Sequence, residues 1–438
     1  MKRIFGSFAY GAGPRDLCWW DQTIAAPEWD VLEGDTSVDV AIVGGGFTGV
    51  SAALHLAEAG VQVLVLEAES PGFGASGRNG GFCCLGGAML KEPAMTRTFG
   101  EGPAREYWQA EAGAVHFAEG LIARLGLDVD RHSRGETQLA HRPKDMEKLR
   151  RKADLMARDG EAVELIEKAD LPAQGLAGPF HGALTTPVGF GLNPRKYLFG
   201  MAAAARAKGA RIVAHSPVTA IVRTGSGYDL TAPRGRVRAK QVIVATNGYS
   251  SDDLPDWLSA RYVPAQSNVL VTRPLTEAEL AAAGWTSDQA SYDTRGLLHY
   301  FRLMPDRRFL FGMRGGLVSS PAAEARARAR NRRDFEAMFP AWTHVESPFA
   351  WSGMVCLARN RVPFVGVVPG QPGLFAGMAY HGNGVAMGSW SGSLLAALVQ
   401  GTNRVPQVMR TPLARFPLGP LRRLLMPPFY LARALGDL

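Results

Sequence analysis

A glycine-rich turn between two apolar segments constrains the fold of this chain more than any other feature. Residues 40–43 are Val-Ala-Ile-Val, and Gly44, Gly46 and Gly49 follow in the spacing G-x-G-x-x-G. A stretch with a helical pattern comes next, and a second apolar segment ends at Glu67. This order predicts a strand, a tight turn, a helix and a second strand closed by an acid, which is the βαβ unit of dinucleotide-binding proteins.

Each residue type in this unit has a physical reason. Gly44 permits the tight turn, Gly46 has no side chain to block a diphosphate, and Gly49 lets the helix pack closely on the strands. The helix N-terminus presents free N–H groups and the positive end of its dipole to that diphosphate. Glu67, 23 residues after Gly44, is placed to accept hydrogen bonds from ribose hydroxyls. The residues predicted to contact the nucleotide here are Gly44, Gly46, Phe47, Thr48, Gly49, Glu67 and Ala68.

The length and charge of the chain limit its class. With 438 residues the chain is longer than a domain with one hydrophobic core usually is, so we expect two lobes. The net charge of +8 admits an acidic substrate or a membrane surface, although solvated surface is the simpler explanation. The densest basic run, residues 325–333, has no aromatic side chains among its arginines, so we expect no nucleic-acid partner.

Cysteine usage and hydropathy favour a cytoplasmic protein. Cys18, Cys83, Cys84 and Cys356 have neither metal-ligand spacing nor the pattern of a disulfide framework, so we expect no metal site. The adjacent pair Cys83-Cys84 leaves two interpretations open. The two thiols could have a redox role, or they could simply fill space in the core as small buried side chains. We expect no signal peptide, and no window reaches the ~18 uncharged apolar residues of a membrane span.

Periodicity and turn residues divide the rest of the chain into helical and extended regions. Helices are expected at about 94–125, 144–158, 197–208, 321–339 and 388–400. Strands are expected at 211–214, 218–223, 241–245, 269–273, 297–303, 309–313 and 374–376. This order predicts an α/β fold, in which a Rossmann-type nucleotide lobe is interleaved with an α+β lobe built on an antiparallel sheet. The nucleotide lobe would use residues 37–90, 185–252 and 350–402, the second lobe 91–184 and 253–349, and the C-terminal tail 403–438.

Three further segments favour FAD over NAD as the dinucleotide. The loop 74–81, Gly-Ala-Ser-Gly-Arg-Asn-Gly-Gly, leaves bare backbone for a flat ring, and its Arg78 can meet a phosphate or a flavin edge. The strand that ends at 245–248, Ala-Thr-Asn-Gly, resembles the return strand of flavoproteins that bind two dinucleotides. The loop 373–388 precedes a helix whose dipole can stabilise negative charge on a reduced flavin. The residues predicted to bind FAD in this part of the chain are Ser76, Arg78, Asn79, Gly80, Gly81, Val218, Ala245, Thr246, Gly248, Tyr380, Gly382, Asn383, Gly384 and Val385.

These segments resemble the FAD-dependent amine and amino-acid oxidase family that contains glycine oxidase, sarcosine oxidase and D-amino-acid oxidase. The likeness is greatest to its γ-glutamylputrescine oxidase branch and runs from about residue 16 to the end. Its motifs are the loop 74–81, the Tyr-Phe-Arg-Leu strand with a Pro-Asp turn at 300–306, Trp-x-Gly at 351–353 with Asn-Arg-x-Pro at 360–363, and Arg-Phe-Pro-Leu at 415–418. The resemblance implies a flavoprotein that oxidises a small-molecule amine.

The chain departs from this family at the positions that usually hold the substrate. Val355 stands where the resemblance places a carboxylate-binding arginine, and Ala386 stands where it places a carboxylate-binding lysine. Leu310 occupies the position of the lysine used for oxygen activation. Met354 stands near the position of a covalent flavin cysteine, with Cys356 two residues away, so we expect non-covalent FAD.

Five residues are candidates for the substrate site. Alternation in the strand 298–303 places Tyr300 and Arg302 on one face and His299 on the other, and one of these faces should line the cavity over the flavin. Arg314, on the next strand, and Arg302 are the arginines left to hold an anionic group. Trp351 suits the wall of an amine pocket. Each has an alternative structural explanation, which is a salt bridge for the arginines and core packing for the others.

The expected activity is the oxidation of a primary or secondary amine to an imine, which water hydrolyses, with molecular oxygen reduced to hydrogen peroxide. The absence of the oxygen-activating lysine leaves open a dehydrogenase that passes electrons to another carrier. An NAD(P)H-dependent reductase would need a second G-x-G-x-x-G in a strand–helix setting, and the sequence has none. A flavin-bearing protein without catalytic activity is a third alternative, and the oligomeric state stays open.

Overall fold

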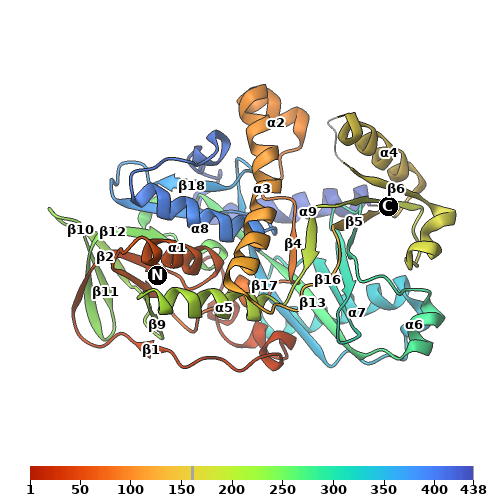
Figure 1. Ribbon diagram of the computed structural model, residues 1–438, viewed down its shortest axis with the longest axis horizontal. Coiled ribbons are helices and arrows are strands. Elements are labelled where there is room, and N and C mark those ends of the chain that lie inside the picture. The colour runs from red at the N-terminus through yellow and green to blue at the C-terminus, as the bar shows by residue number, and fades with distance from the viewer. Residues whose placement is uncertain (159–161, 438) are drawn as a thin grey trace.

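The computed structural model describes residues 1–158 and 162–437. Two large sheets organise it, with the first and its helices at one end of the molecule and the second at the other (Figure 1). The first sheet has nine strands in the described part of the chain, and its main path runs β1-β9-β3-β2-β12-β11-β10. These strands are β1 (Asp30–Val31), β2 (Thr36–Val43), β3 (Val63–Leu66), β9 (Arg211–Ala214), β10 (Ala220–Arg223), β11 (Tyr228–Ala232), β12 (Gly235–Val244), β18 (Phe364–Val367) and β19 (Leu374–Met378).

The centre of the first sheet is parallel and buried on both faces. β2 pairs in parallel with β3 and β12, and β12 pairs in parallel with β19. Their inner segments are unbroken apolar runs, as expected for strands covered on both sides. Helix α1 (Phe47–Glu58) packs between α5 (Pro194–Ala207) and α8 (Ala386–Val399) on one face. This packing fixes the N-terminus of α1 at the carboxyl end of β2.

The second sheet has eight strands in the described ranges, in the order β17-β13-β16-β15-β14-β5-β7-β6. All neighbouring pairs are antiparallel except β14 with β5, which is parallel. The strands are β5 (Glu136–Leu139), β6 (Glu164–Glu167), β7 (Gly182–Thr186), β13 (Tyr262–Pro274), β14 (Ala290–Asp293), β15 (His299–Leu303), β16 (Arg308–Arg314) and β17 (Phe349–Ala358). A small sheet of β4 (Phe82–Cys84) and β8 (Gly189–Gly191) lies beside them.

One face of the second sheet is covered by helices. Helix α7 (Pro321–Met338) lies across β13, β16 and β17, and α4 (Pro143–Arg158) and α6 (Glu277–Ala283) cover the outer strands and loops. Beneath α7 the core is aromatic, because Phe301 and Phe311 of the sheet meet Phe335 and Phe339 of the helix region. The opposite face is left free for the cavity described below.

Most of the expected helices and strands are present. One expected helix is divided, and one segment pairs with a sheet other than the expected one. The helix expected at 94–125 is divided into α2 (Glu92–Phe99) and α3 (Glu101–Leu125), because Gly100 adopts a φ of +89°. The range 350–402 was assigned to the nucleotide lobe, yet β17 pairs with β13 along its whole length in the second sheet. Sheet membership alone does not define a domain, so the division into lobes stays a prediction.

The C-terminal tail folds back onto the body. The buried side chain of Arg422 donates to the Tyr262 carbonyl oxygen at 2.7 Å and to Asp252 Oδ2 at 2.8 Å. Helix α9 (Met426–Gly436) follows, and Met426 packs against Val263 and Ala265 of β13. Within the described ranges no helix is both long and apolar enough to cross a membrane.

Candidate functional site

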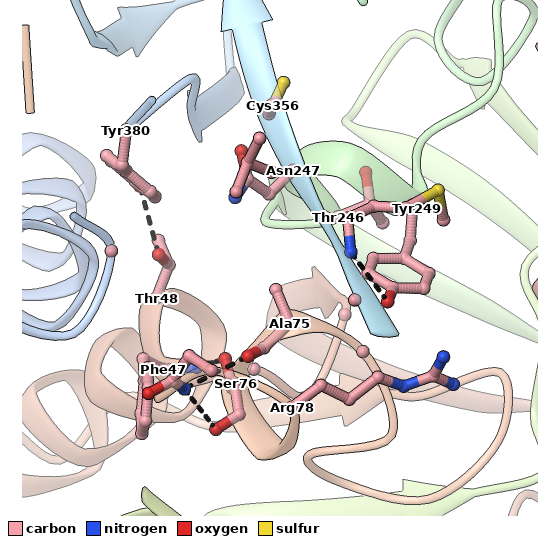
Figure 2. A pocket seen from close by; sticks show the side chains of 18 of the residues that line it. Phe47, Thr48, Ala75, Ser76, Arg78, Thr246, Asn247, Tyr249, Cys356 and Tyr380 are labelled. Carbon is pink, nitrogen blue, oxygen red and sulfur yellow. Dashed lines mark hydrogen bonds between the residues drawn. The ribbon is translucent and has the colours of Figure 1, made fainter. Parts of the chain in front are cut away.

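The site begins at the turn between β2 and α1. Gly44 has a φ of +108°, and a Cβ there would lie 2.8 Å from the carbonyl oxygen of Ala245. Gly46 is the N-cap of α1, and a Cβ on it would lie 2.8 Å from Ser76 Oγ, which accepts a hydrogen bond from the Phe47 N–H at 2.9 Å (Figure 2). Gly44 is therefore required by its backbone conformation, a Cβ at position 46 would crowd the Ser76 hydroxyl, and the first turn of α1 presents N–H groups that have no partner within the helix.

A cavity of about 340 Å³ opens over this turn and reaches the second sheet. Glu67 and Val218 line one part of it, the α1 N-terminus lies in its wall, and Tyr300 and Arg314 line another part. Of the predicted cofactor-binding residues, those that line it are Gly44, Gly46, Phe47, Thr48, Glu67, Ala68, Ser76, Arg78, Asn79, Gly80, Val218, Ala245, Thr246, Tyr380, Gly382, Asn383, Gly384 and Val385. Three predicted residues, Gly49, Gly81 and Gly248, pack behind this wall and do not line the cavity.

Glu67 lies at the end of β3 beside the glycine turn. Its Oε2 accepts a hydrogen bond from the Gly45 N–H at 2.6 Å, and its Oε1 accepts one from the Glu69 N–H at 3.1 Å. Burial raises the pKa of this carboxyl group, and the backbone N–H groups oppose that shift. The same contacts hold the carboxylate at the cavity wall, where a ribose hydroxyl can donate to it.

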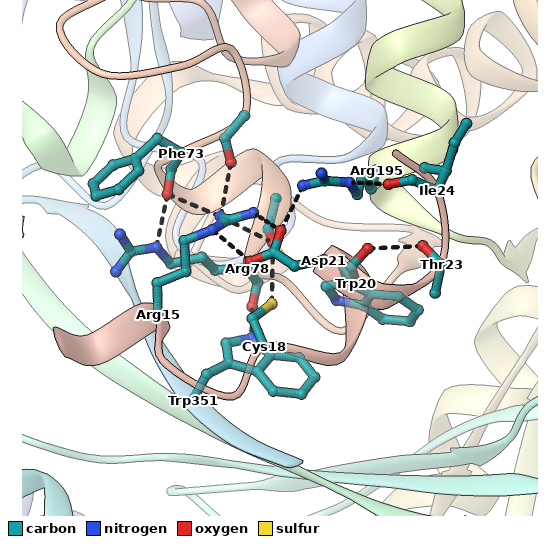
Figure 3. A network of polar contacts seen from close by, with 12 residues as sticks. Arg15, Cys18, Trp20, Asp21, Thr23, Ile24, Phe73, Arg78, Arg195 and Trp351 are labelled. Atoms are coloured by element: carbon teal, nitrogen blue, oxygen red, sulfur yellow. Dashed lines mark hydrogen bonds and ion pairs between the residues drawn. The ribbon is translucent and has the colours of Figure 1, made fainter. Parts of the chain in front are cut away.

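The loop 74–81 is held in place largely by Arg78. The Arg78 side chain is 2% exposed, and its Nε donates to the Phe73 carbonyl oxygen at 2.7 Å. Its guanidinium lies over the rings of Phe73 and Tyr249. A second arginine, Arg15, donates to the carbonyl oxygens of Gly72 and Phe73 at 3.1 and 3.2 Å (Figure 3). Arg78 thus stabilises the loop from within the cavity wall. Arg15, in the N-terminal segment, stabilises the same loop, and this role was not anticipated from the sequence.

The return strand and the last glycine-rich loop close the cavity from the other side. The Tyr380 hydroxyl is 3.0 Å from Thr48 Oγ1, and burial raises the Tyr380 pKa to about 12 (Figure 2). The Ala358 N–H donates to His381 Nε2 at 3.1 Å, so Nδ1 carries the proton and donates to the Gly87 carbonyl oxygen at 2.7 Å. Burial lowers the His381 pKa to about 4. A neutral imidazole therefore anchors the loop that leads into α8.

Two of the five candidate substrate residues line the cavity. The Tyr300 hydroxyl is 3.0 Å from Ser267 Oγ, and burial raises the pKa of this phenol. Arg314 Nη2 donates to the His381 carbonyl oxygen at 3.3 Å, which is the one hydrogen bond of this side chain within residues 1–158 and 162–437. Burial lowers the Arg314 pKa, and no carboxylate of the described residues forms an ion pair with it. Arg314 is thus a half-buried cation that faces the cavity without an anion.

The other three candidates lie outside the cavity wall. His299 is between Asp293 and Asp334, at 3.0 and 3.2 Å, and its ring stacks on Phe311. Arg302 Nη1 is 2.8 Å from His132 Nε2, and Nη2 donates to the Leu192 carbonyl oxygen at 2.8 Å. Trp351 is 1% exposed and donates from Nε1 to the Arg78 carbonyl oxygen at 2.8 Å. Trp351 matches its structural explanation, which was core packing. Arg302 has a histidine and a carbonyl oxygen as partners and no salt bridge, and His299 is held by two carboxylates, so both differ from the structural explanations given for them.

The positions where the chain departs from the family resemblance also have defined places. Met354, Val355 and Cys356 of β17 line the cavity, whereas Leu310 is fully buried in the core beside Trp20 and Val269. Burial raises the Cys356 pKa to about 12, so its thiol is protonated at neutral pH. All four cysteines are unpaired and buried.

Several wall residues were missed by sequence reasoning. Glu136 of β5 and Tyr292 of β14 line the cavity, as do Cys84 and Leu85. The segment around Glu136 has no motif, and only its pairing with β14 brings it to the site. An alternating pattern in the strand 290–293 was the one feature that could have drawn attention to Tyr292.

The residues present fit an FAD molecule. The bare glycine turn, the free N–H groups of α1 and the carboxylate of Glu67 form a cradle for a diphosphate and a ribose, and a Cβ at Gly46 would fill part of it. The cavity continues from this cradle to the second sheet, where a flavin ring would meet the loops 74–81 and 380–385. The fold and the cradle define a flavin-dependent oxidoreductase.

The comparisons with known proteins agree with this class. The family model described as "FAD dependent oxidoreductase" (DAO) matches residues 39–398, so the chain belongs to that family. The chain is 32% identical over 382 residues to the γ-glutamylputrescine oxidoreductase of Escherichia coli. The aligned region covers 85% of this chain and 86% of that protein. It is therefore an FAD-dependent enzyme that acts on amines or amino acids.

Solved structures show the same fold. Glycine oxidase from Geobacillus kaustophilus has a TM-score of 0.72 at 23% identity, over 86% of this chain and 99% of that chain. Iminodiacetate oxidase from a Chelativorans species has a TM-score of 0.70 at 20% identity, over 85% and 98% of the two chains. At these identities the likeness establishes the fold and not the substrate.

Proposed function

We propose that this enzyme oxidises a primary or secondary amine that also carries an anionic group. The observation that carries the proposal is Arg314, a half-buried guanidinium at the cavity wall with no ion-pair partner in the described ranges. A buried charge without a partner is unfavourable, and a bidentate contact to a carboxylate compensates for its lost hydration. Val355 leaves no arginine at the usual family position, so Arg314 takes over the binding of the anion.

Three compound classes carry both groups. They are γ-glutamylated diamines, iminodiacetate-like N-substituted glycines and N-methyl amino acids. The first class agrees with the name of the Escherichia coli relative, which shares 32% of its residues with this chain. We place it first in a screen for that reason.

The chain's own residues bind and orient the amine. When bound, FAD accepts two electrons as a hydride from the carbon beside the amine nitrogen. Arg314 would hold the anionic group, and the Tyr300 hydroxyl, kept protonated by burial, would hydrogen-bond the substrate. Leu85 and Leu298 exclude water from this part of the cavity, which favours the neutral form of the amine. Loss of the hydride and one proton gives an imine, and water converts it to a carbonyl compound and an amine or ammonia.

Binding of FAD is proposed to be non-covalent and to use the predicted residues that line the cavity. Met354 stands where a cysteine would attach the flavin, and a thioether cannot form that bond. The protonated thiol of Cys356 is a poor nucleophile, because only the thiolate attacks readily.

The electron acceptor is proposed to be molecular oxygen, which takes two electrons and two protons to give hydrogen peroxide. Leu310 favours a second candidate, a dehydrogenase that reduces another carrier. Leu310 stands in the core at the position of the oxygen-activating lysine, and no lysine lines the cavity in the described ranges.

Anaerobic bleaching of the bound flavin tests the proposal. Each candidate amine is mixed with the holoenzyme under nitrogen, and absorbance near the flavin maximum is followed, with NADPH as the comparison. Bleaching by an acidic amine and not by NADPH is expected. Bleaching by NADPH alone would replace the proposal with a reductase. Admission of oxygen then separates the two acceptors, because rapid recovery with stoichiometric peroxide identifies an oxidase.

A further inference from the structure

Glu136 is a buried acidic residue in the wall of the same cavity. Its residue is 6% exposed, and it lines the cavity together with Cys84 and Tyr292. Among the ion pairs of residues 1–158 and 162–437 none involves Glu136. The cation that acts on the pKa of Glu136 is Lys152 of α4, whose Nζ donates to Gln138 Oε1 at 3.4 Å. The mechanism described above does not use this carboxyl group.

The register of the second sheet places Glu136 on the same face as the proposed substrate residues. Glu136 pairs in parallel with Ala290, and Tyr292, two residues further along β14, pairs with Tyr300. Tyr300 in turn pairs with Gly312, two residues before Arg314. Directly paired residues and residues two apart share a face of a sheet. Glu136, Tyr292, Tyr300 and Arg314 therefore project from one face, which forms the floor of the cavity.

Glu136 and Arg314 stand well apart on this floor. Three strand spacings separate β5 from β16, which is about 14 Å between backbones. A ligand that reaches both charges must therefore be elongated, with an anionic group near Arg314 and a cationic group near Glu136.

We propose that Glu136 binds a second positively charged nitrogen of the substrate, one that is not oxidised. This assignment rests on the proposed amine oxidation, which supplies the reacting nitrogen. It narrows the substrate class to elongated amines with two nitrogens, in which the second ammonium and the anionic group lie at opposite ends of the molecule. An ammonium group donates charge-assisted hydrogen bonds to a carboxylate, and burial strengthens such a pair.

The surroundings of Glu136 give the site a pH dependence. Burial raises its pKa to about 7, while Lys152 and the polar side chains of Cys84 and Tyr292 act in the opposite direction. Behind it, on α3, Glu111 also has a pKa of about 7, and Glu136 contributes to raising it. Because the carboxylate form predominates above pH 7, affinity for a cationic group should increase as the pH rises through 7.

The test compares Glu136→Gln with Glu111→Gln. Glutamine keeps the size and removes the charge, and Glu111 is a matched control because it is equally buried, has the same raised pKa and does not line the cavity. Two pairs of probes differ only in a second ammonium group. The first pair is 1,4-diaminobutane and 1-aminobutane. The second pair is 4-(4-aminobutylamino)butanoate, whose carboxylate and terminal ammonium lie at opposite ends, and 4-(butylamino)butanoate.

In Glu136→Gln, kcat/KM is expected to fall roughly 10- to 100-fold for the probes with the second ammonium and to stay within about two-fold for their partners. Glu111→Gln should leave all four values within about two-fold. Equal losses for both members of each pair would overturn the proposal, since Glu136 would then serve the reacting nitrogen. Unchanged values would overturn it as well.

Direct binding separates this inference from the proposed function. Calorimetric titration of 1,4-diaminobutane into the anaerobic holoenzyme should give a Kd that weakens roughly 10- to 100-fold in Glu136→Gln, whether or not the diamine bleaches the flavin. Absence of bleaching by every amine would refute the oxidation alone. If Glu136→Gln does not fold, the same measurement is made on the wild-type protein at several pH values. The ratio of the affinity for the diamine to the affinity for the monoamine should rise between pH 6 and pH 8. A ratio that does not change with pH would refute the role of Glu136.

Discussion

Replacement of Arg314 by methionine provides the most direct test of the proposed anion site. Arg302 is the matched control, because it is a buried arginine on the adjacent strand of the same sheet. The two differ in their partners. The Arg302 side chain is 2.8 Å from His132 Nε2 and from the Leu192 carbonyl oxygen, whereas the Arg314 side chain makes one hydrogen bond, at 3.3 Å, to the His381 carbonyl oxygen.

These contacts set opposite expectations for stability. Arg314→Met removes a half-buried cation that has no anion, so the free energy of unfolding should change by less than about 1 kcal/mol or increase. Arg302→Met leaves the His132 nitrogen and the Leu192 carbonyl oxygen without their donor, which costs about 1–3 kcal/mol for each buried group. Urea unfolding of the two holoenzymes measures both values.

The expectations for activity are also opposite. In Arg314→Met a substrate carboxylate would enter the cavity without a partner, which costs about 2–5 kcal/mol, so KM for an acidic amine should rise roughly 30-fold or more. A neutral amine of the same length should be affected less than about three-fold. Arg302→Met should change both substrates alike. Efficient turnover of D-amino acids that neither replacement affects, or an equal effect of Arg314→Met on acidic and neutral amines, would refute the placement of the anion site.

Three further predictions follow from the cofactor site. Gly46→Val should abolish FAD binding, because its side chain would occupy the diphosphate cradle beside Ser76; a purified variant with stoichiometric flavin would contradict this. Acid or heat should release all the FAD from the wild-type chain, and flavin that stays on the denatured protein would implicate Cys356. The lowered pKa of His381, about 4 against 6.5 when unfolded, contributes stability that is present above pH 6.5 and lost as the pH falls towards 4. His381→Gln should remove up to about 3 kcal/mol of this dependence, measured by urea unfolding at pH 7 and pH 4.5.

The nucleotide end of the site was predictable from sequence because its chemistry is local. The spacing of Gly44, Gly46 and Gly49 encodes the turn directly, and a Cβ at any of the three would meet neighbouring atoms. The loop 74–81 was also predictable, although the reason for Arg78 was not. Its guanidinium binds backbone carbonyl groups and aromatic rings of the chain, so sequence pattern alone could not separate bracing from phosphate binding.

The substrate end was less predictable because strand pairing assembles it. Alternation along β15 placed Tyr300 and Arg302 on one face, yet Tyr300 lines the cavity and Arg302 does not. Arg302 lies towards the end of the strand, where the backbone of Gly81 and Gly191 encloses its guanidinium. Glu136 was missed because its role depends on a parallel pairing with residues about 150 positions away, which periodicity cannot indicate.

The glycines of the loop 74–81 therefore have two functions. A Cβ on Gly80 would lie 2.7 Å from the ring of Tyr300, and one on Gly81 would collide with the guanidinium of Arg302. On the opposite loop a Cβ on Gly382 would lie 3.0 Å from Arg314 Nη2. Each cofactor loop thus leaves room for a side chain of the second sheet as well as for the flavin. Since the same glycines serve both purposes, their presence in the sequence predicts a flavoprotein but carries no information about which side chain of the second sheet meets the substrate.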